Sequence, residues 1–276
     1  MSLGAVIDAQ HRLSKALEAP CQEALVYTRK QPIKNADETS WKQGTSGAYL
    51  WVCVTSLVVA FVIQTSRAAS AAGVLLGAAK GILGSDRYSG YAWWPTALRQ
   101  VCWAHLIRDF RAIAERGKSS AVLGEGLLGE AERIFALWGR LRTGQLQRKT
   151  FQVYMKLARK RVEELLLQGT TDPNPKTART CRKMWSLREA FWTFARIEGV
   201  EPTNNAAEQA LRFGVLWRKM CYGTKSLAGS QFVARVLTVQ ATLRKQNRNV
   251  HAFLRAACEA HRNGKPAPSL LPDCAA

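Results

Sequence analysis

The fold is decided by residues 33–65, which read IKNADETSWKQGTSGAYLWVCVTSLVVAFVIQT. Three runs within this stretch, 33–41, 48–55 and 57–65, are rich in Val, Trp, Phe and Thr and are separated by short Gly, Ser and Thr segments. Such runs are typical of strands that are joined by tight turns. They predict an antiparallel meander of three strands.

The segments after the meander predict a crossover. Residues 67–80 carry Ala and Leu at helical spacing, and residues 81–86 form a short apolar run that ends in an acid. A further run, 100–106, predicts a fifth strand that leads into a helix over 107–116. A meander, a helix and a parallel strand in this order are typical of a ribonuclease-H-like sheet. We therefore expect an α/β fold with a mixed five-stranded sheet.

The rest of the chain reads as helical. The first 30 residues have helical spacing, and we expect Pro20 to interrupt the helix. Residues 119–198 predict a block of helices with one clear break at 169–175. Helices are also expected over two later segments, 204–218 and 227–261.

Composition narrows the class of protein. The chain has 276 residues, 47% of them hydrophobic and 22% charged, which is an ordinary globular composition. It has 40 Lys and Arg against 20 Asp and Glu, a formal net charge of +20. Such a surplus is typical of proteins that bind polyanions, most often nucleic acid. A basic protein that needs only solubility is the alternative.

The first residues, the longest apolar run and the cysteines together predict a reducing compartment. The apolar run Leu50–Ile63 is too short to span a bilayer and is interrupted by Thr55 and Ser56. The first residues lack the pattern of a signal peptide. The seven cysteines are an odd number without a Cys-x-x-Cys pair, which argues against a secreted disulfide framework. We expect a cytoplasmic protein.

Three acids stand out by their positions. Asp37 lies in the first predicted strand, and Asp86 ends the fourth. Because these strands are neighbours in the expected sheet, both carboxylates would point to one place, and a late helix could bring Glu208 there. Carboxylate oxygens are ligands that suit Mg²⁺, and two such ions support in-line phosphoryl transfer.

Each acid also has a structural explanation. Asp37 fits a strand end, Asp86 could pair with Arg87, and Glu208 has capping-box spacing from Asn205. The charges around Glu208 favour a role as metal ligand. Glu208 is the one acid between residues 203 and 258, a stretch that contains nine Lys and Arg. An isolated carboxylate in such a stretch would repel phosphate unless a cation is bound to it.

Five blocks carry a resemblance to a known family. They are Ala36-Asp-Glu-Thr39, Ser85-Asp-Arg-Tyr-Ser-Gly-Tyr91, Cys102-Trp-Ala-His-Leu106, Pro202-Thr-Asn-Asn-Ala-Ala-Glu208 and Trp217-Arg-Lys219. In this order they resemble the catalytic region of DDE transposases of the insertion-sequence-66 family, from about residue 20 to the Pro-rich tail at 266–272.

The resemblance implies a ribonuclease-H-like core with a large all-helical insertion before the third acid, and a helical C-terminal part. It divides the chain into a lead-in (1–32), the first part of the catalytic core (33–116), the insertion (117–200), closing helices with the third acid (201–262) and a tail (263–276).

The family's three carboxylates correspond to Asp37, Asp86 and Glu208. They imply DNA strand cleavage and strand transfer in the transposition of an insertion sequence, with two Mg²⁺ ions or Mn²⁺ as a substitute. The implied partners are DNA ends and target DNA, a second copy of the chain on the DNA, and accessory proteins of the same element. The implied location is the bacterial cytoplasm, at the nucleoid.

The front end departs from the family, because only about 35 residues precede Asp37 and none has paired Cys or His ligands. We therefore expect the chain to lack the usual amino-terminal DNA-binding part. A truncated, catalytically silent DNA-binding remnant is one alternative. A ribonuclease-H-fold nuclease or resolvase is another.

Further residues around the third acid are candidates for DNA contact: Asn204, Asn205, Arg212, Trp217, Arg218, Lys219 and Lys225. The two asparagines could simply cap the helix, Arg212 could pair with the acid four residues before it, and Trp217 could be buried in the core. His105 is a candidate for contact with phosphate or with a metal-bound water. Its Cys-x-x-His spacing recurs at Cys258 and His261, but we favour buried or separate residues over a zinc site.

Overall fold

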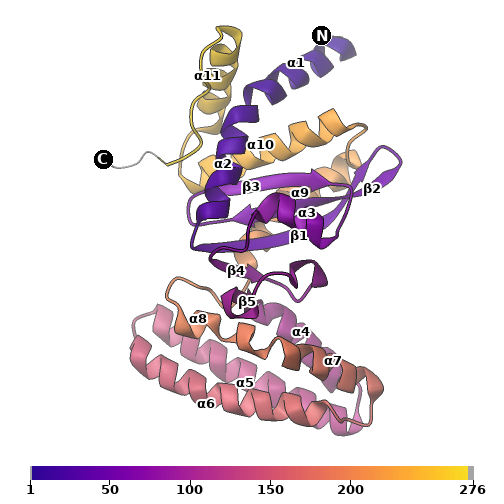
Figure 1. Cartoon of the computed structure of the whole chain (residues 1–276), viewed down its shortest axis with the longest axis vertical. Helices are drawn as coiled ribbons and strands as arrows, with labels where there is room; N and C mark the ends of the chain where they lie inside the picture. The colour runs from indigo at the N-terminus through magenta and orange to yellow at the C-terminus, as the bar shows by residue number, and fades with distance from the viewer. Residues whose placement is uncertain (1, 273–276) are drawn as a thin grey trace. The chain divides into compact units, whose positions relative to one another are not determined.

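The computed structural model describes residues 2–272 and has the expected α/β fold (Figure 1). Five strands form one sheet in the order β3-β2-β1-β4-β5. The strands are β1 (Ile33–Gln43), β2 (Ser46–Val54), β3 (Val59–Gln64), β4 (Ile82–Ser85) and β5 (Arg99–Val101). The α-helices are α1 (Leu3–Ala16), α2 (Glu18–Lys30), α3 (Ala69–Leu76), α4 (Trp103–Ala114), α5 (Lys118–Arg142), α6 (Arg148–Gly169), α7 (Pro175–Ser186), α8 (Thr193–Arg196), α9 (Asn205–Cys221), α10 (Leu227–Lys245) and α11 (Val250–Arg262). Short 3-10 turns are η1 (Ser89–Tyr91), η2 (Thr96–Leu98) and η3 (Arg188–Phe191).

The chain forms two compact units. The first, the sheet unit, comprises, among the described residues, 2–83, 88–94 and 205–272. The second, the helical unit, comprises residues 84–87 and 95–204. Strand β4 begins in the sheet unit and ends in the helical unit, which contains β5. The division into core, insertion and closing helices remains a prediction.

The predicted meander is confirmed. Strand β1 pairs antiparallel with β2, and β2 pairs antiparallel with β3. The turn between β2 and β3 falls at the expected Thr55, whose hydroxyl donates to the Val58 carbonyl (2.8 Å) and accepts from the Val58 amide (3.1 Å). This side chain closes the turn and so fixes the register of the apolar strands on either side.

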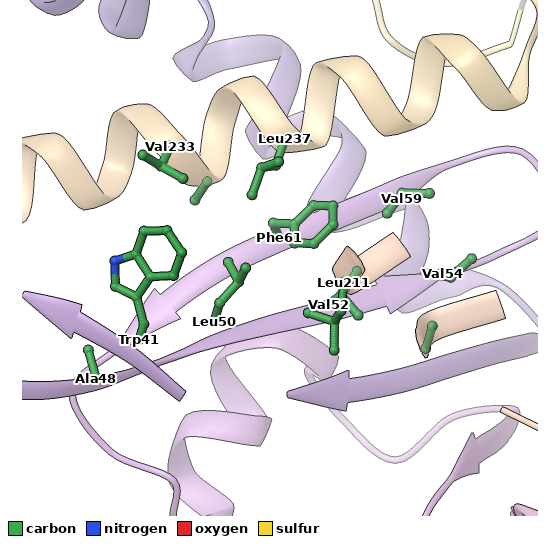
Figure 2. Close-up of a cluster of buried hydrophobic side chains, with 12 residues drawn as sticks. Trp41, Ala48, Leu50, Val52, Val54, Val59, Phe61, Leu211, Val233 and Leu237 are labelled. Atoms are coloured by element: carbon green, nitrogen blue, oxygen red, sulfur yellow. The ribbon is translucent and has the colours of Figure 1, made fainter. Parts of the chain in front are cut away.

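One face of the meander carries the main core of the sheet unit. Leu50 and Val52 of β2 and Phe61 of β3 pack with Leu211 of α9 and Leu237 of α10 (Figure 2). Helix α9 lies very close to the sheet, because a Cβ added at Gly214 would come within 2.2 Å of Leu50 Cδ2. Glycine therefore permits the approach that places the first turn of α9 over the sheet.

The edge strand β3 is protected by threonines of α10. Thr242 Oγ1 accepts from the Val59 amide (3.0 Å) and donates to the Val59 carbonyl (2.9 Å). One helical turn earlier, Thr238 Oγ1 accepts from the Phe61 amide (2.9 Å). Both threonines are fully buried. Hydroxyls at i and i+4 thus satisfy polar groups of the edge strand, which would otherwise be open to another strand.

A buried lysine anchors the start of β1. Lys34 Nζ donates to the carbonyls of Arg29 and Lys80, both at 2.8 Å, and lies 5.5 Å from the centroid of the Trp94 ring. Desolvation by burial lowers the pKa of Lys34 below its usual value. The hydrogen bond to Arg29 thus connects the last turn of α2 to the start of β1.

Several predicted boundaries are corrected. The first helices are separated at Leu17 and not by Pro20, which lies in the first turn of α2, where a backbone donor is dispensable. The fifth strand is only Arg99–Val101, because α4 already begins at Trp103. The expected helix over 227–261 is two helices, and Asn249 caps the second by accepting from the Ala252 amide (2.9 Å).

The helical unit shows the expected break at 169–175 and two breaks that the sequence did not reveal, one at 143–147 and one after Ser186, where a 3-10 turn separates α7 from the short α8. Asp172, in the expected break, accepts from Ser120 Oγ (2.9 Å), Ser119 Oγ (3.0 Å) and the Asn174 amide (2.8 Å). Desolvation opposes the charged form of Asp172, but these hydrogen bonds and the charge of Arg116 outweigh it and lower the pKa of the carboxyl. The break is thus tied to the start of α5.

Candidate active site

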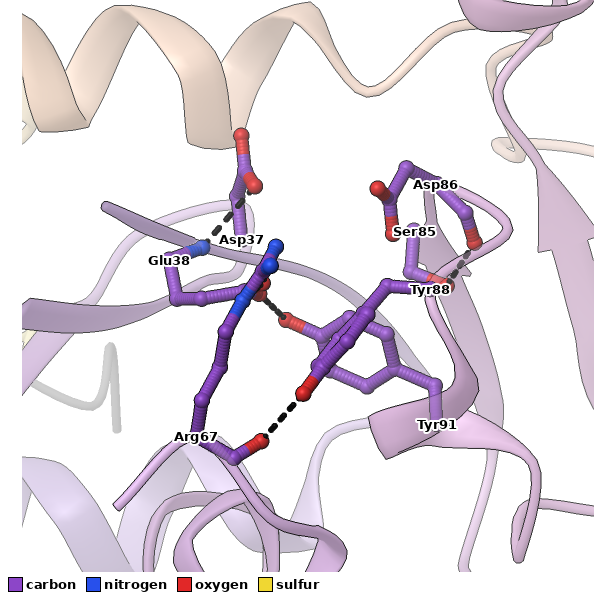
Figure 3. A network of polar contacts seen from close by, with 7 residues as sticks. All are labelled: Asp37, Glu38, Arg67, Ser85, Asp86, Tyr88 and Tyr91. Carbon is purple, nitrogen blue, oxygen red and sulfur yellow. Dashed lines mark hydrogen bonds and ion pairs between the residues drawn. The ribbon is translucent and has the colours of Figure 1, made fainter. Parts of the chain in front are cut away.

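Strand β1 presents two neighbouring acids to opposite faces of the sheet. Asp37 lies opposite Val52 and Glu38 opposite Trp51 of β2. Val52 belongs to the core under α9, so Asp37 is on the face of the sheet that α9 covers. The Asp37 Oδ1 atom accepts from the Glu38 amide (2.8 Å), and the two side chains point away from each other (Figure 3). Asp37 is half-buried.

Glu38 is anchored by a polar network on the other face (Figure 3). Only 2% of its side chain is exposed. Tyr91 donates to Oε2 (2.6 Å), and Arg67 donates to Oε1 through Nε (2.9 Å) and Nη2 (2.7 Å). The Arg67 guanidinium stacks on the Tyr88 ring at 3.9 Å, and Tyr88 donates to the Arg67 carbonyl (2.7 Å). This network fixes the backbone of β1 next to Asp37.

Sequence reasoning missed the role of Glu38. The partners lie 29 and 53 residues further along the chain, in segments that the sequence alone does not place next to β1. A signal was present, because two adjacent acids in a strand must face opposite sides of the sheet. An acid on each face requires a partner on each face.

Asp86 is held through its backbone. It follows Ser85, the last residue of β4, and is half-buried. Arg99, which is only 1% exposed, donates to Ser85 Oγ (3.0 Å) and to the Asp86 carbonyl (2.9 Å). Ser85 Oγ donates to the same carbonyl at 3.0 Å. The neighbouring Arg87 pairs with Asp109. A buried cation thus fixes the peptide that carries the Asp86 side chain.

Glu208 lies in the first turn of α9 and is half-buried. Because the helix begins at Asn205, Asn204 occupies the N-cap position and Ala207 the third helical position. A capping box would need the acid at that third position, so Glu208 is one residue too far along the chain for it. The helix start therefore does not fit the capping box that the spacing from Asn205 suggests.

The asparagines before Glu208 differ in exposure. Asn204 is fully buried, and its amide donates to Cys102 Sγ at 3.2 Å within the helical unit. Asn205 is exposed at the start of α9. The buried thiol thus helps to fix the residue that precedes the helix.

The candidate DNA-contact residues on α9 and just after it have mixed surroundings. Trp217 is half-buried against the core, with its ring 6.4 Å from that of Phe232. Arg218 donates to Thr39 Oγ1 (3.2 Å) and to the carbonyl and hydroxyl of Ser40, and so ties α9 to β1. Three other cations are exposed: Arg212, Lys219 and Lys225. The contacts of these residues with DNA remain a prediction.

His105 lies in the first turn of α4, where its Nε2 accepts from Arg108 Nη2 (2.9 Å). Cys258 and His261 are on α11 and exposed, and no cluster of potential metal ligands within residues 2–272 includes either of them. The six cysteines in this part of the chain are all free. Burial raises the pKa of Cys21 and of Cys53 to about 12, so neither is a nucleophile.

No helix within residues 2–272 combines the length and the apolar character that a membrane span requires.

The fold and these acids define a class. The strand order and the helices that follow it are those of a ribonuclease-H-like DDE fold. The sequence profile described as "Transposase IS66 family" matches residues 1–232, which is most of the chain. The chain belongs to this transposase family. The matched span begins before residue 20 and ends within α10, so the Pro-rich tail lies outside it. Searches of curated proteins and of solved structures found no match.

Proposed function

We propose that this chain cleaves DNA strands and joins the freed 3′ ends to target DNA, with Asp37, Asp86 and Glu208 as the ligands of two Mg²⁺ ions. The observation that carries the proposal is the transposase-family match over residues 1–232, which the strand order of a DDE fold supports. Asp37 and Glu208 belong to the sheet unit, where α9 packs on β1 and β2. Asp86 directly follows β4, which lies beside β1 in the sheet.

The donor set fits the metal. Carboxylate oxygens are hard ligands that Mg²⁺ and Mn²⁺ prefer, and half-buried acids leave room for phosphate oxygens and water. When bound, the ions lower the pKa of the attacking water or 3′-hydroxyl and stabilise the oxygen that leaves. Asp37, Asp86 and Glu208 would be the residues that hold these ions, with Asp37 as the acid shared between them.

The chemistry balances without a covalent protein–DNA intermediate. In cleavage, water attacks a phosphodiester, a 3′-hydroxyl leaves and a 5′-phosphate remains. In joining, that 3′-hydroxyl attacks a phosphodiester of target DNA and displaces another 3′-hydroxyl. The protein's part is to hold the acids in place and to bind DNA through its basic side chains. We propose Asn204, Asn205, Arg212, Trp217, Arg218, Lys219 and Lys225 for the DNA contact, and His105 for a water near the ions.

We further propose that two copies of the chain act together on paired DNA ends, with accessory proteins of the same element where they are present. Two ends that are cut and joined in concert require two sets of acids.

The test is a strand-transfer assay with the full chain, a pre-cleaved 3′-OH duplex and a plasmid target in Mn²⁺ or Mg²⁺ at low salt. Substitutions Asp37→Ala, Asp86→Ala and Glu208→Ala should each lower joined product by more than the about 10- to 100-fold that follows loss of an outer-sphere partner of a metal ligand. Glu198→Ala, at an exposed acid, is the matched control and should join as the wild type does.

The proposal fails if folded, DNA-binding wild-type protein gives no joined product. It also fails if the three alanine variants join as well as the control variant does.

A further inference from the structure

Two adjoining cavities run along α6 in the helical unit. One, of about 400 Å³, lies between α6 and the segment Trp192–Arg196. The other, of about 440 Å³, lies between α6 and Trp185 of α7. Lys156 and Arg159 line both cavities, which are therefore neighbours along α6 and are here together called the α6 groove.

The first cavity is strongly basic. Among its lining residues are four cations, Lys149, Lys156, Arg159 and Arg196, and no acid. Arg159 is held by Glu163 at 2.7 Å. The other three form no ion pair with any residue between 2 and 272. Like charges in one cavity repel each other, so this arrangement favours an anionic ligand.

The groove is also rigid and partly aromatic. Gln152 Nε2 donates to the Ala195 carbonyl (3.2 Å), and Arg148 donates to the Phe194 carbonyl (3.3 Å), so α6 is fixed to the opposite wall. Trp192, only 2% exposed, contributes to that wall. At the other end, Arg188 stacks on Trp185 at 4.4 Å. A preformed site loses little entropy when it binds its ligand.

The spacing of the cations selects the shape of the ligand. Lys149 and Lys156 are seven residues apart on α6, which corresponds to about 10 Å along the helix axis at 1.5 Å per residue. A single phosphate is too small to contact both side chains from one place, whereas a nucleic-acid backbone presents phosphates in a row. Residues 148–161 contain six cations and no acid, so the positive charge continues along the helix.

We propose that the α6 groove binds the phosphodiester backbone of DNA, at a surface additional to the carboxylate site. The inference rests on the proposed function only in that DNA is the substrate. Binding here would hold a DNA segment on the helical unit independently of metal ions, since the basic first cavity has no acid among its lining residues and Glu163, in the second cavity, is paired with Arg159. Basic side chains with interleaved aromatic rings are the usual features of such a surface.

The test measures binding of the full chain to a labelled duplex in EDTA by fluorescence anisotropy over a salt series. The groove variant carries Lys149→Gln, Lys156→Gln and Arg196→Gln. The control variant loses the same charge at exposed residues outside both cavities, through Arg140→Gln, Arg142→Gln and Lys183→Gln.

Each lost phosphate contact removes about 0.9 from the slope of log K against log salt, or about 8-fold in affinity at 0.1 M salt. The groove variant should therefore bind about 50-fold or more weakly, with a slope smaller by about 2 to 3. The control should change by less than about 5-fold, through long-range attraction alone.

A photo-crosslinker locates the contact. Benzoylphenylalanine in place of Val153, which lines the first cavity, should crosslink to DNA. The same group in place of Val122, an exposed residue of α5, should not.

Equal weakening of the groove and control variants, or equal crosslinking at both positions, overturns the inference. If the groove binds an acidic protein and not DNA, the groove and control variants should show equal weakening of DNA binding. Wild-type protein that binds DNA through the groove but joins no strands refutes the proposed function and leaves the groove standing.

Discussion

Replacing Glu38 by Gln tests whether the network on the far face of the sheet holds β1 in place. The carboxylate is 2% exposed and accepts three hydrogen bonds from Tyr91 and Arg67. An amide of the same shape keeps one acceptor oxygen but turns an NH₂ group toward one of these donors. Tyr91 is fully buried and cannot turn to water, whereas Arg67 is 45% exposed and can.

The magnitude follows from this asymmetry. A hydrogen bond to a charged group contributes about 1.5–3 kcal/mol when it is buried, and exposed pairs contribute about 0–1 kcal/mol. Counting the Tyr91 contact as buried and the Arg67 contact as half-exposed, we expect Glu38→Gln to lower the free energy of unfolding by about 2–3 kcal/mol. Urea denaturation followed by circular dichroism measures this difference.

Two comparisons make the test specific. Glu164→Gln, in an exposed pair with Lys160, should change the free energy of unfolding by less than about 0.5 kcal/mol. In a double-mutant cycle of Glu38→Gln with Tyr91→Phe, the coupling energy should be about 1–2 kcal/mol. A coupling energy near zero, or a Glu38→Gln variant as stable as the Glu164→Gln control, would refute the role given to the network.

Three further changes test the fold at other points. Thr242→Val should lower the free energy of unfolding by about 1–3 kcal/mol and promote aggregation, because it leaves the amide and carbonyl of Val59 on the edge strand unsatisfied; urea denaturation and light scattering measure both. Gly223→Ala should cost about 2 kcal/mol or more, because its φ is +100° and a Cβ would lie 2.2 Å from a backbone oxygen, whereas Gly129→Ala, in an open helical position, should be neutral or stabilising in the same assay. Asp172→Asn should destabilise the chain at pH 6, and its difference from wild type should shrink as the pH falls below 3.8, because a carboxyl with a lowered pKa stabilises the fold only while it is ionised; a difference that is constant from pH 6 to pH 2.5 would contradict this.

The sheet could be predicted from the sequence because its signals are local. Runs rich in Val, Trp, Phe and Thr and the turn at Thr55 define three strands within 33 residues. The break before α11 was missed because its cause is tertiary. Arg248 donates to the carbonyls of Ser269 and Leu271, and Asn247 adopts a left-handed backbone with φ of 54°. Nothing within a helical window of sequence shows these partners.

In the candidate site, too, the sequence reveals some residues and not others. Asp37, Asp86 and Glu208 were found because motif and position mark them, and the family match supports the motif. Their supporting residues were missed. Arg99 is a cation in a buried strand, and its role becomes visible only when Ser85 is seen to accept its hydrogen bond. Sequence identifies the acids, whereas structure identifies what holds their backbone in place.

That division has a testable consequence for Asp86. If Arg99 and Ser85 position the Asp86 backbone, Arg99→Met should lower both the free energy of unfolding and the amount of joined DNA, because it removes a buried donor from two acceptors. Asp86→Asn keeps the shape and the backbone contacts and should lower joining alone. Loss of a metal ligand should thus lower joining alone, whereas loss of the residue that positions it should lower both joining and stability. If Asp86→Asn instead destabilises the chain as much as Arg99→Met does, the acid is part of the scaffold, and its proposed role as a metal ligand fails.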